Sequence, residues 1–266
     1  MNYTLNVHGR LLNLSRPLVM GILNATPDSF FADSRRQTEE DVVMCCQKML
    51  SEGAAIIDVG GCSTRPGGEV ATEAQEMERL RMALDVVRRN QPQAIISVDT
   101  FRPDVARMAV EEFGADIIND VSGGTPEMFR MVTRLRVPYI LISLQPTIRE
   151  MLLSFAEKVQ QLRDMGATDI ILDPGFGFGK TLEQNYQVMN ELEKLLVMEL
   201  PLLVGISRKS MIYRAFECTP KEALNGTTAL NTIALMKGTS ILRVHDVKEA
   251  VECVRIVESL NGQIVK

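Results

Sequence analysis

Polar and charged side chains follow most of the apolar segments of this sequence, at the points where buried strands would end. The set combines amides, carboxylates and cations: Asn24, Asp99, Asn119, Asp173, Lys209, Arg243 and His245. An Asp or Asn at such a point often caps a helix or forms a turn, so a single one has a simple structural explanation. Three chemical kinds at so many strand ends are harder to explain by capping. We therefore expect the set to line a shared site.

Asp99, Asn119 and Asp173 suit a planar heterocycle that carries several N–H and C=O groups. The buried polar edges of such a ligand need matched partners, and these side chains supply acceptors and donors along a cavity wall. A carboxylate such as that of Asp173 can accept two N–H bonds from a guanidine-like edge.

Cations in the same set point to an anionic group on the ligand. Arg243 and His245 directly precede the last helical segment, and basic groups near a helix N-terminus favour phosphate. Lys209 can flank a ring edge or a phosphate, and Arg65 adds a cation in a glycine-containing loop. Asn24 offers an oxygen to Mg²⁺, a hard ion that takes few protein ligands when substrate phosphates supply others.

Alternating apolar and amphipathic segments predict the fold that brings these residues together. The apolar segments, nearly continuous in hydrophobicity as in parallel strands covered on both faces, are 18–23, 55–59, 94–98, 116–118, 139–142, 169–172, 202–206 and 240–244. The amphipathic segments are 39–51, 73–89, 102–113, 128–136, 151–165, 182–195, 225–237 and 247–260. We predict an α/β fold, a (β/α)8 TIM barrel, whose loops after the strands gather at one mouth. A doubly wound open sheet is the alternative, but no G-x-G-x-x-G motif follows the first strand.

The first residues stand apart from this alternation. Residues 3–7 and 11–14 have the pattern of a β-hairpin with Gly9 at its turn, and such a hairpin could plug the N-terminal end of the barrel. No linker or sharp change of composition interrupts the sequence, so we predict a single domain over residues 1–266.

Composition excludes several classes of protein and of site. The net charge of −5 argues against a broad nucleic-acid-binding surface, and no apolar run approaches the length of a membrane span. The start lacks a signal-peptide pattern, so we expect a cytoplasmic protein with reduced thiols. The five cysteines, Cys62 included, present no nucleophile or zinc pattern. Residues 175–181 superficially resemble a phosphate-binding loop, but the spacing is one residue short.

Several motifs, in order along the chain, resemble the signatures of dihydropteroate synthases. They are Asn24-Ala25-Thr26-Pro27-Asp28-Ser29-Phe30, Gly60-Gly61-Cys62-Ser63-Thr64-Arg65-Pro66-Gly67, Asp173-Pro174-Gly175-Phe176-Gly177-Phe178-Gly179-Lys180, Ser207-Arg208-Lys209-Ser210 and Arg243-Val244-His245-Asp246. The match covers essentially the whole chain.

This resemblance implies a TIM barrel, commonly a homodimer, that works in folate biosynthesis. The implied reaction joins 6-hydroxymethyl-7,8-dihydropterin diphosphate to 4-aminobenzoate, with Mg²⁺, and releases 7,8-dihydropteroate and diphosphate. The residues implied to hold the pterin are Asp99, Asn119, Asp173 and Lys209. Those implied to face the diphosphate and the metal are Asn24, Thr64, Arg243 and His245, with Val244 among the substrate-binding residues. The implied aminobenzoate pocket contains Thr64, Arg65, Pro66, Phe178 and Ser207.

Three departures from the family pattern are visible. Phe31-Ala32-Asp33-Ser34 stands where glycines are usual, and Cys62 stands where Glu is usual. Ser143-Leu144 replaces a common His-Met pair after the fifth strand. Because Leu144 can still pack on a pterin face, we expect little loss of affinity.

Two other functions remain open. A pterin-binding methyltransferase would have a similar barrel but no diphosphate to bind. A catalytically silent pterin-binding partner would not need the loop cations. The combination of Lys209, Arg243 and His245 with the loop residues favours the synthase over both.

Overall fold

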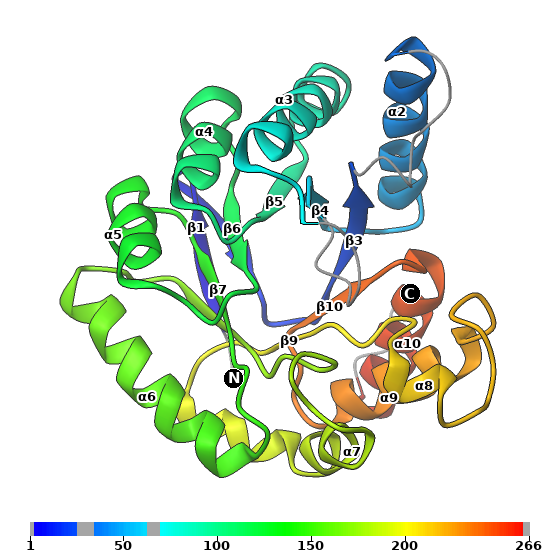
Figure 1. Ribbon diagram of the computed structural model, residues 1–266. Coiled ribbons are helices and arrows are strands. Elements are labelled where there is room, and N and C mark those ends of the chain that lie inside the picture. The colour runs from blue at the N-terminus through cyan, green and yellow to red at the C-terminus, as the bar shows by residue number, and fades with distance from the viewer. Residues whose placement is uncertain (1–2, 26–34, 63–69, 263–266) are drawn as a thin grey trace.

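A sheet of eight parallel strands forms the centre of the computed structural model, which describes residues 3–25, 35–62 and 70–262 (Figure 1). The strands are β3 (Leu18–Asn24), β4 (Ile56–Gly60), β5 (Ile95–Asp99), β6 (Ile117–Asp120), β7 (Tyr139–Ile142), β8 (Ile170–Asp173), β9 (Leu203–Val204) and β10 (Ile241–Val244). Their order is β8-β7-β6-β5-β4-β3-β10-β9, and a parallel bridge between Leu172 and Leu202 connects the two ends. The predicted barrel is confirmed, and the open sheet is wrong.

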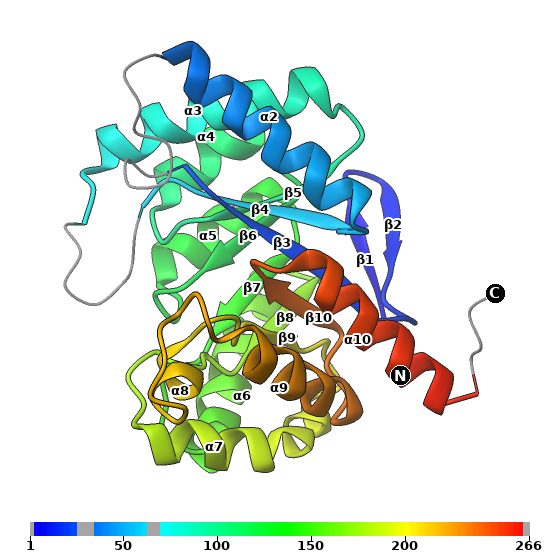
Figure 2. The ribbon, with the colours of Figure 1, turned by 90° about the vertical axis from the view of Figure 1, so that its right-hand side faces the viewer.

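Helices lie between successive strands and cover the outside of the barrel (Figures 1 and 2). They are α2 (Arg35–Ser51), α3 (Glu73–Asn90), α4 (Pro103–Phe113), α5 (Pro126–Leu135), α6 (Ile148–Asp164), α7 (Leu182–Asn190), the 3₁₀ helix η1 (Leu192–Met198), α8 (Ser210–Tyr213), α9 (Leu224–Met236) and α10 (Val247–Leu260). The predicted helix 182–195 is thus divided into α7 and η1, and the four-residue α8 was not predicted. Within the described ranges, none of these helices has the length and apolar character to cross a bilayer.

Threonine side chains begin four of the helices. Thr72, Thr125, Thr147 and Thr181 accept the backbone N–H that lies three residues further on, at the starts of α3, α5, α6 and α7. Such caps satisfy donors that a helix leaves unpaired at its first turn. The Asp and Asn residues at the strand ends therefore do not serve as caps for these helices.

Side chains alternate between the two faces of every barrel strand, as strand geometry requires. The outward side chains pack against the helices in the main hydrophobic core. The inward side chains at the N-terminal end of the barrel form a second apolar cluster: Met20, Ile56, Ile117, Ile140, Ile171, Leu203 and Ile241.

The N-terminal hairpin closes this end of the barrel. β1 (Thr4–Val7) pairs antiparallel with β2 (Arg10–Asn13), and both turn residues have positive φ, 50° at His8 and 81° at Gly9. Leu5 and Val7 are buried in the inner cluster. Figure 2 shows the hairpin beside the ends at which the barrel strands begin. The predicted plug is confirmed.

Candidate active site

The inward-facing side chains change from apolar to polar within two residues along several strands. On β4 the residue two positions after Ile56 is Asp58, and on β8 the residue two positions after Ile171 is Asp173. The same step leads to Asn119 on β6 and Arg243 on β10. These residues share a face with the apolar cluster, so they line the C-terminal half of the barrel interior.

Arg243 holds two carboxylates together at this mouth. Its Nε donates to Asp58 Oδ2 over 2.6 Å, and its Nη2 donates to Asp99 Oδ2 over 2.7 Å. Asn119 Nδ2 donates to the same oxygen of Asp58 over 3.2 Å. Asp58 is thereby joined to β10 and β6 directly, and to Asp99 at the end of β5 through Arg243.

Burial controls the protonation of this cluster. Burial raises the pKa of Asp99 to about 7, because Arg243 only partly offsets the loss of solvation and Asp58 adds repulsion. For Arg243, burial lowers the pKa, but the carboxylates of Asp58 and Asp99 raise it by more, so the guanidinium stays charged.

Asp173 and Lys209 form a second charged group across the mouth. Asp173 Oδ1 accepts the backbone N–H of Gly175 over 2.7 Å, and burial raises the pKa of its carboxyl against the opposing effect of Lys209. Lys209 Nζ lies 4.6 Å from the centre of the Phe178 ring, and burial lowers the pKa of its ammonium to about 8. The ammonium of Lys209 thus lies over the ring face of Phe178, a cation–π contact that joins the loops after β8 and β9.

Backbone contacts explain the glycine-rich loop after β8. Gly175 has φ 69°, and a Cβ there would lie 2.2 Å from the carbonyl oxygen of Ser143. Lys180 Nζ donates to the carbonyls of Ser143, Gly175 and Phe178 over 3.1, 3.0 and 3.3 Å. Lys180 therefore holds the loop in place, as expected for a loop that only superficially resembles a phosphate-binding motif.

His245 is held by its neighbour on the preceding loop. Ser207 Oγ lies 3.1 Å from His245 Nδ1 and accepts the backbone N–H of His245 over 3.2 Å. Helix α10 begins two residues later, so its positive N-terminal end lies close to this pair. Val244 differs from the expectation, because its side chain is fully buried in the outer core. The alternation of the strand turns the Val244 side chain away from the mouth, so this side chain does not line the site.

Asn24 ends β3 beside the Arg243 cluster. Its Oδ1 and Asp99 Oδ2 both lie 3.9 Å from the point that a Cβ of Gly60 would occupy. Among the described residues, no three His, Cys, Asp or Glu side chains are grouped to hold a metal. Thr64, Arg65 and Pro66, and the segment with Asp33, lie outside the described residues.

The structure adds one residue that the sequence analysis overlooked. Asp58 lies inside an apolar strand segment and is completely buried. A carboxylate in such a position costs free energy unless it is paired, and this signal was available in the sequence. Leu144 is 44% exposed and lies over Gly123, so its predicted contact with a pterin face stays a prediction.

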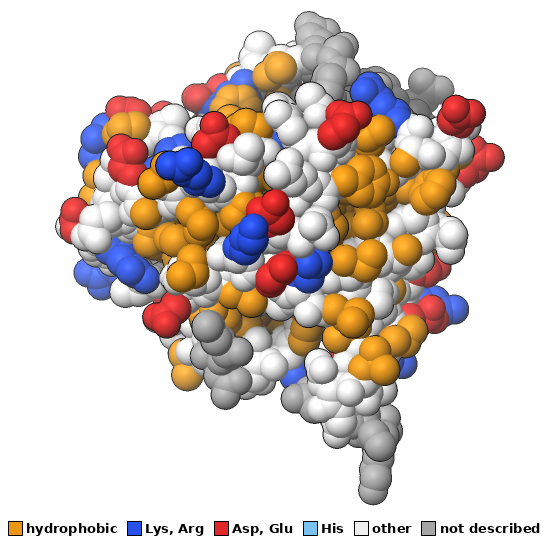
Figure 3. Space-filling model, turned by 90° about the horizontal axis from the view of Figure 1, so that it is seen from below, with side chains coloured by type: hydrophobic (Ala, Val, Ile, Leu, Met, Phe, Trp, Pro, Cys, Tyr) orange, Lys and Arg blue, Asp and Glu red, His pale blue; other side chains and the backbone are white. Residues whose placement is uncertain are grey.

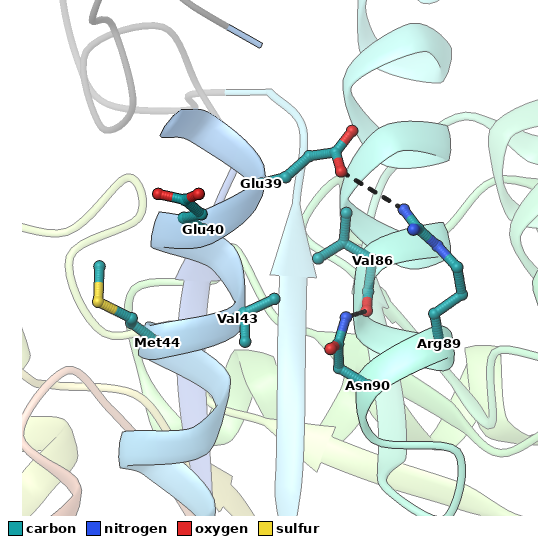
Figure 4. Close-up of a pocket in the computed structure, with 7 residues that line it drawn as sticks. All are labelled: Glu39, Glu40, Val43, Met44, Val86, Arg89 and Asn90. Carbon is teal, nitrogen blue, oxygen red and sulfur yellow. Dashed lines mark hydrogen bonds and ion pairs between the residues drawn. The ribbon is translucent and has the colours of Figure 1, made fainter. Parts of the chain in front are cut away.

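A surface pocket of about 480 Å³ lies elsewhere, between α2 and α3 on the outside of the barrel (Figure 4). It is bordered by the ion pair of Glu39 and Arg89, whose charged atoms are 3.6 Å apart. None of the residues predicted for the site lines it. The convergence of charged groups, and not this pocket, marks the candidate active site.

Known proteins resemble the chain over nearly its whole length. Residues 20–245 match the family described as pterin binding enzyme. The chain is 39% identical to the dihydropteroate synthase of Escherichia coli K12, over 94% of each chain. The structure of 7,8-dihydropteroate synthase from Vibrio fischeri aligns with a TM-score of 0.90 at 36% identity, covering 99% of this chain and 100% of that one.

A third protein, the dihydropteroate synthase of Xanthomonas albilineans solved with 4-aminobenzoic acid, aligns with a TM-score of 0.90 at 34% identity. The alignment covers 98% of this chain and 99% of that one. These matches agree with the resemblance found in the motifs. The chain belongs to the family of pterin-binding enzymes.

Proposed function

We propose that this enzyme is a dihydropteroate synthase, a transferase that joins 6-hydroxymethyl-7,8-dihydropterin diphosphate to 4-aminobenzoate. The observation that carries the proposal is the meeting of Asp99, Asn119 and Asp173 with Lys209 and Arg243 at one barrel mouth. The names of the relatives support it.

The acceptors at the mouth suit the donor edge of a pterin. Burial raises the pKa of Asp173, but Lys209 and the backbone N–H of Gly175 favour its charged form, in which it can accept N–H bonds from the amino-pyrimidine edge of the ring. Lys209 supplies a donor for a ring carbonyl or ring nitrogen. The apolar cluster below the polar residues limits how deeply the ring can enter.

In the proposed reaction, the bond between the pterin methylene carbon and the diphosphate oxygen breaks first. The electron-rich dihydropterin stabilises the positive charge left on the methylene. Arg243, His245 and the N-terminus of α10 neutralise the charge that grows on the departing diphosphate. The amine nitrogen of 4-aminobenzoate then bonds to the methylene carbon and loses a proton. This neutral amine needs orientation more than it needs a strong base.

Mg²⁺ fits this site on one condition. Asn24 offers a neutral oxygen beside Asp99, which suits a hard ion only when substrate oxygens complete its shell. The ion would supply charge stabilisation on the diphosphate. Asn24 would hold it from the protein side.

The aminobenzoate pocket is proposed from the resemblance, with Thr64, Arg65, Pro66, Phe178 and Ser207 around it. Phe178 and Ser207 lie on the loops after β8 and β9, which border the mouth.

A homodimer is part of the proposal. The face of the molecule that is lowest in Figure 1 carries patches of hydrophobic side chains (Figure 3). Leu153 of α6, Val197 of η1 and Met236 of α9 are 66%, 72% and 67% exposed. Exposed apolar patches often mark protein interfaces. Light scattering on the purified protein tests this part of the proposal.

The activity is tested by diphosphate release on mixing the pterin substrate, 4-aminobenzoate and Mg²⁺, with each omitted in turn. Release that requires both substrates, together with formation of 7,8-dihydropteroate, supports the synthase. Pterin binding without diphosphate release would favour a methyltransferase or a silent binding protein.

A further inference from the structure

Asp58 is a fully buried carboxylate in the interior of the barrel mouth to which neither the motifs nor the resemblance assigned a role. It lies on β4 with no exposed surface, and a single oxygen, Oδ2, accepts from two partners. The partners are Asn119 Nδ2 at 3.2 Å and Arg243 Nε at 2.6 Å. Both partners belong to the proposed substrate site.

This arrangement determines which end of the Asn119 amide faces the ligand. An ionised carboxylate only accepts hydrogen bonds, so the amide must turn its NH₂ group toward Asp58. Asn119 Oδ1 is then the end left for the cavity. Asp58 thereby makes Asn119 an acceptor, like Asp99 and Asp173.

The same oxygen fixes the plane of the Arg243 guanidinium. Arg243 has one nitrogen on Asp58 and another on Asp99, at 2.6 and 2.7 Å. A guanidinium held at two nitrogens cannot rotate about its own axis. Its remaining nitrogen, Nη1, keeps a defined direction for a substrate.

The other oxygen of Asp58 is buried without a hydrogen-bond partner in the ranges that the structure describes. Within the described part of the chain, Asp58 Oδ1 and Ser97 Oγ are buried and have no hydrogen-bond partner. The two residues are register partners on β4 and β5. A buried acceptor without a partner is costly, so these atoms are suited to an ordered water below the substrate site.

We propose that Asp58 is a positioning residue that makes the mouth selective for a ring with N–H donors, by turning the Asn119 amide and by holding Arg243. This inference rests on the proposed function and extends it to specificity. The competing explanation is that Asp58 only neutralises Arg243 and stabilises the fold.

The experiment compares the wild-type chain with Asp58→Asn by calorimetric titration of 6-hydroxymethylpterin, a probe that has the ring and no diphosphate. The amide introduced at position 58 has one acceptor oxygen and can also present its NH₂ group to Asn119. The amide of Asn119 is then no longer held in one orientation. We expect the dissociation constant to rise at least about tenfold, the cost of one hydrogen bond to a charged group. In steady-state assays, the KM for 4-aminobenzoate should change less than about twofold, because Asp58 acts on the ring side.

A double-mutant cycle with Asn119→Ala separates positioning from stability. If Asp58 acts through Asn119, Asp58→Asn should weaken the probe by less than about threefold in the Asn119→Ala background. An undiminished effect there would overturn the proposal, as would unchanged affinity in the single variant. Asp116→Asn is the matched control, because Asp116 is also buried and accepts from Arg88 Nη2 at 2.9 Å. It should lower the melting temperature and leave the dissociation constant unchanged.

A replacement variant and a second ligand complete the experiment. If Asp58→Asn does not fold, Asp58→Ala replaces it, since water can fill the space left by the carboxylate. A second titration of the wild type uses the analogue of 6-hydroxymethylpterin that has oxygen in place of the 2-amino group. It should bind at least about tenfold more weakly, because its oxygen, an acceptor, would face the acceptor oxygens of the protein. Equal binding of the two rings would refute the inference. A wild-type protein that binds no pterin and releases no diphosphate would instead refute the proposed function.

Discussion

The two ends of the barrel interior differ sharply although the same strands build both. At the N-terminal end, inward residues such as Met20, Ile56 and Ile171 pack against Leu5 of the hairpin. Two residues further along β4 and β8, the inward residues are Asp58 and Asp173. The backbone geometry does not change along this step, so the difference lies in the side chains alone.

This contrast separates stability from chemistry along each strand. The apolar end contributes buried area and excludes water, while the polar end keeps charged groups that are individually costly to bury. In TIM barrels, the C-terminal face is where sites form and the N-terminal face is where residues serve stability. Substitutions at the two ends should therefore affect different measured quantities.

The largest effect is expected for Arg243→Ala at the polar end. Removal of the guanidinium leaves Asp58 and Asp99 facing each other, and it removes a donor from the proposed diphosphate site. We expect turnover to fall about a thousandfold and ring affinity to fall as well. Steady-state diphosphate release and calorimetry measure the two losses.

The control for that variant is Arg134→Ala, whose ion pair with Glu111 is exposed and spans 3.0 Å. It should change turnover and stability very little. If Arg243→Ala behaved like Arg134→Ala, the polar end would have no role in the reaction.

The second prediction concerns the apolar end. Leu5→Ala removes a side chain that is 2% exposed in the cluster that plugs the barrel. We expect the free energy of unfolding to fall by about 2–5 kcal/mol in urea titrations, while ring affinity stays the same. Leu11→Ala, on the same hairpin but 74% exposed, should change it by less than about 0.5 kcal/mol. A loss of ring affinity in folded Leu5→Ala would show that the two ends are not independent.

The sequence predicted the fold better than it predicted the site. Continuous apolar runs determined all eight barrel strands, because strands covered on both faces must be apolar throughout. The prediction missed α8, since four residues give no helical period to detect. It also extended α7 too far, because η1 continues the apolar pattern in a 3₁₀ geometry.

In the site, the strand ends could be predicted but the contacts could not. Asp99 and Arg243 are 144 residues apart in the sequence, and only the closed barrel brings them to 2.7 Å. Asp58 was not predicted as a site residue because it lies inside a strand instead of at its end. Val244 was misplaced because a motif does not say which alternate side chains face inward.

The third prediction concerns the polar end and uses the raised pKa of Asp99. In the folded chain the pKa is about 7, against an ordinary value of 3.8. Between these values the folded state holds the proton and the unfolded state does not, so the stability contributed by Asp99 falls as the pH rises from about 4 to 7. Asp99→Asn should remove this slope in urea titrations across that range.

Ring affinity should follow the opposite trend. Above about pH 7 the Asp99 carboxylate is charged and accepts hydrogen bonds more strongly, so affinity for 6-hydroxymethylpterin should improve about fivefold between pH 6 and 8. Calorimetry at fixed ionic strength measures this change, with Asp99→Asn as the reference. A profile that is the same in both proteins would mean that Asp99 does not titrate in this window.

The smallest effect is expected for Ser207→Ala, which tests how finely the polar end is positioned. Ser207 Oγ lies 3.1 Å from His245 Nδ1, so its loss removes one contact that orients the imidazole without removing the imidazole itself. We expect turnover to fall about threefold to tenfold, and ring affinity to stay within about twofold, because His245 is proposed to act on the diphosphate. Ser207→Thr keeps the hydroxyl and should retain more of the turnover than Ser207→Ala. If both variants lost ring affinity instead of turnover, Ser207 and His245 would contact the pterin ring. The residues after β10 would then not form the diphosphate site.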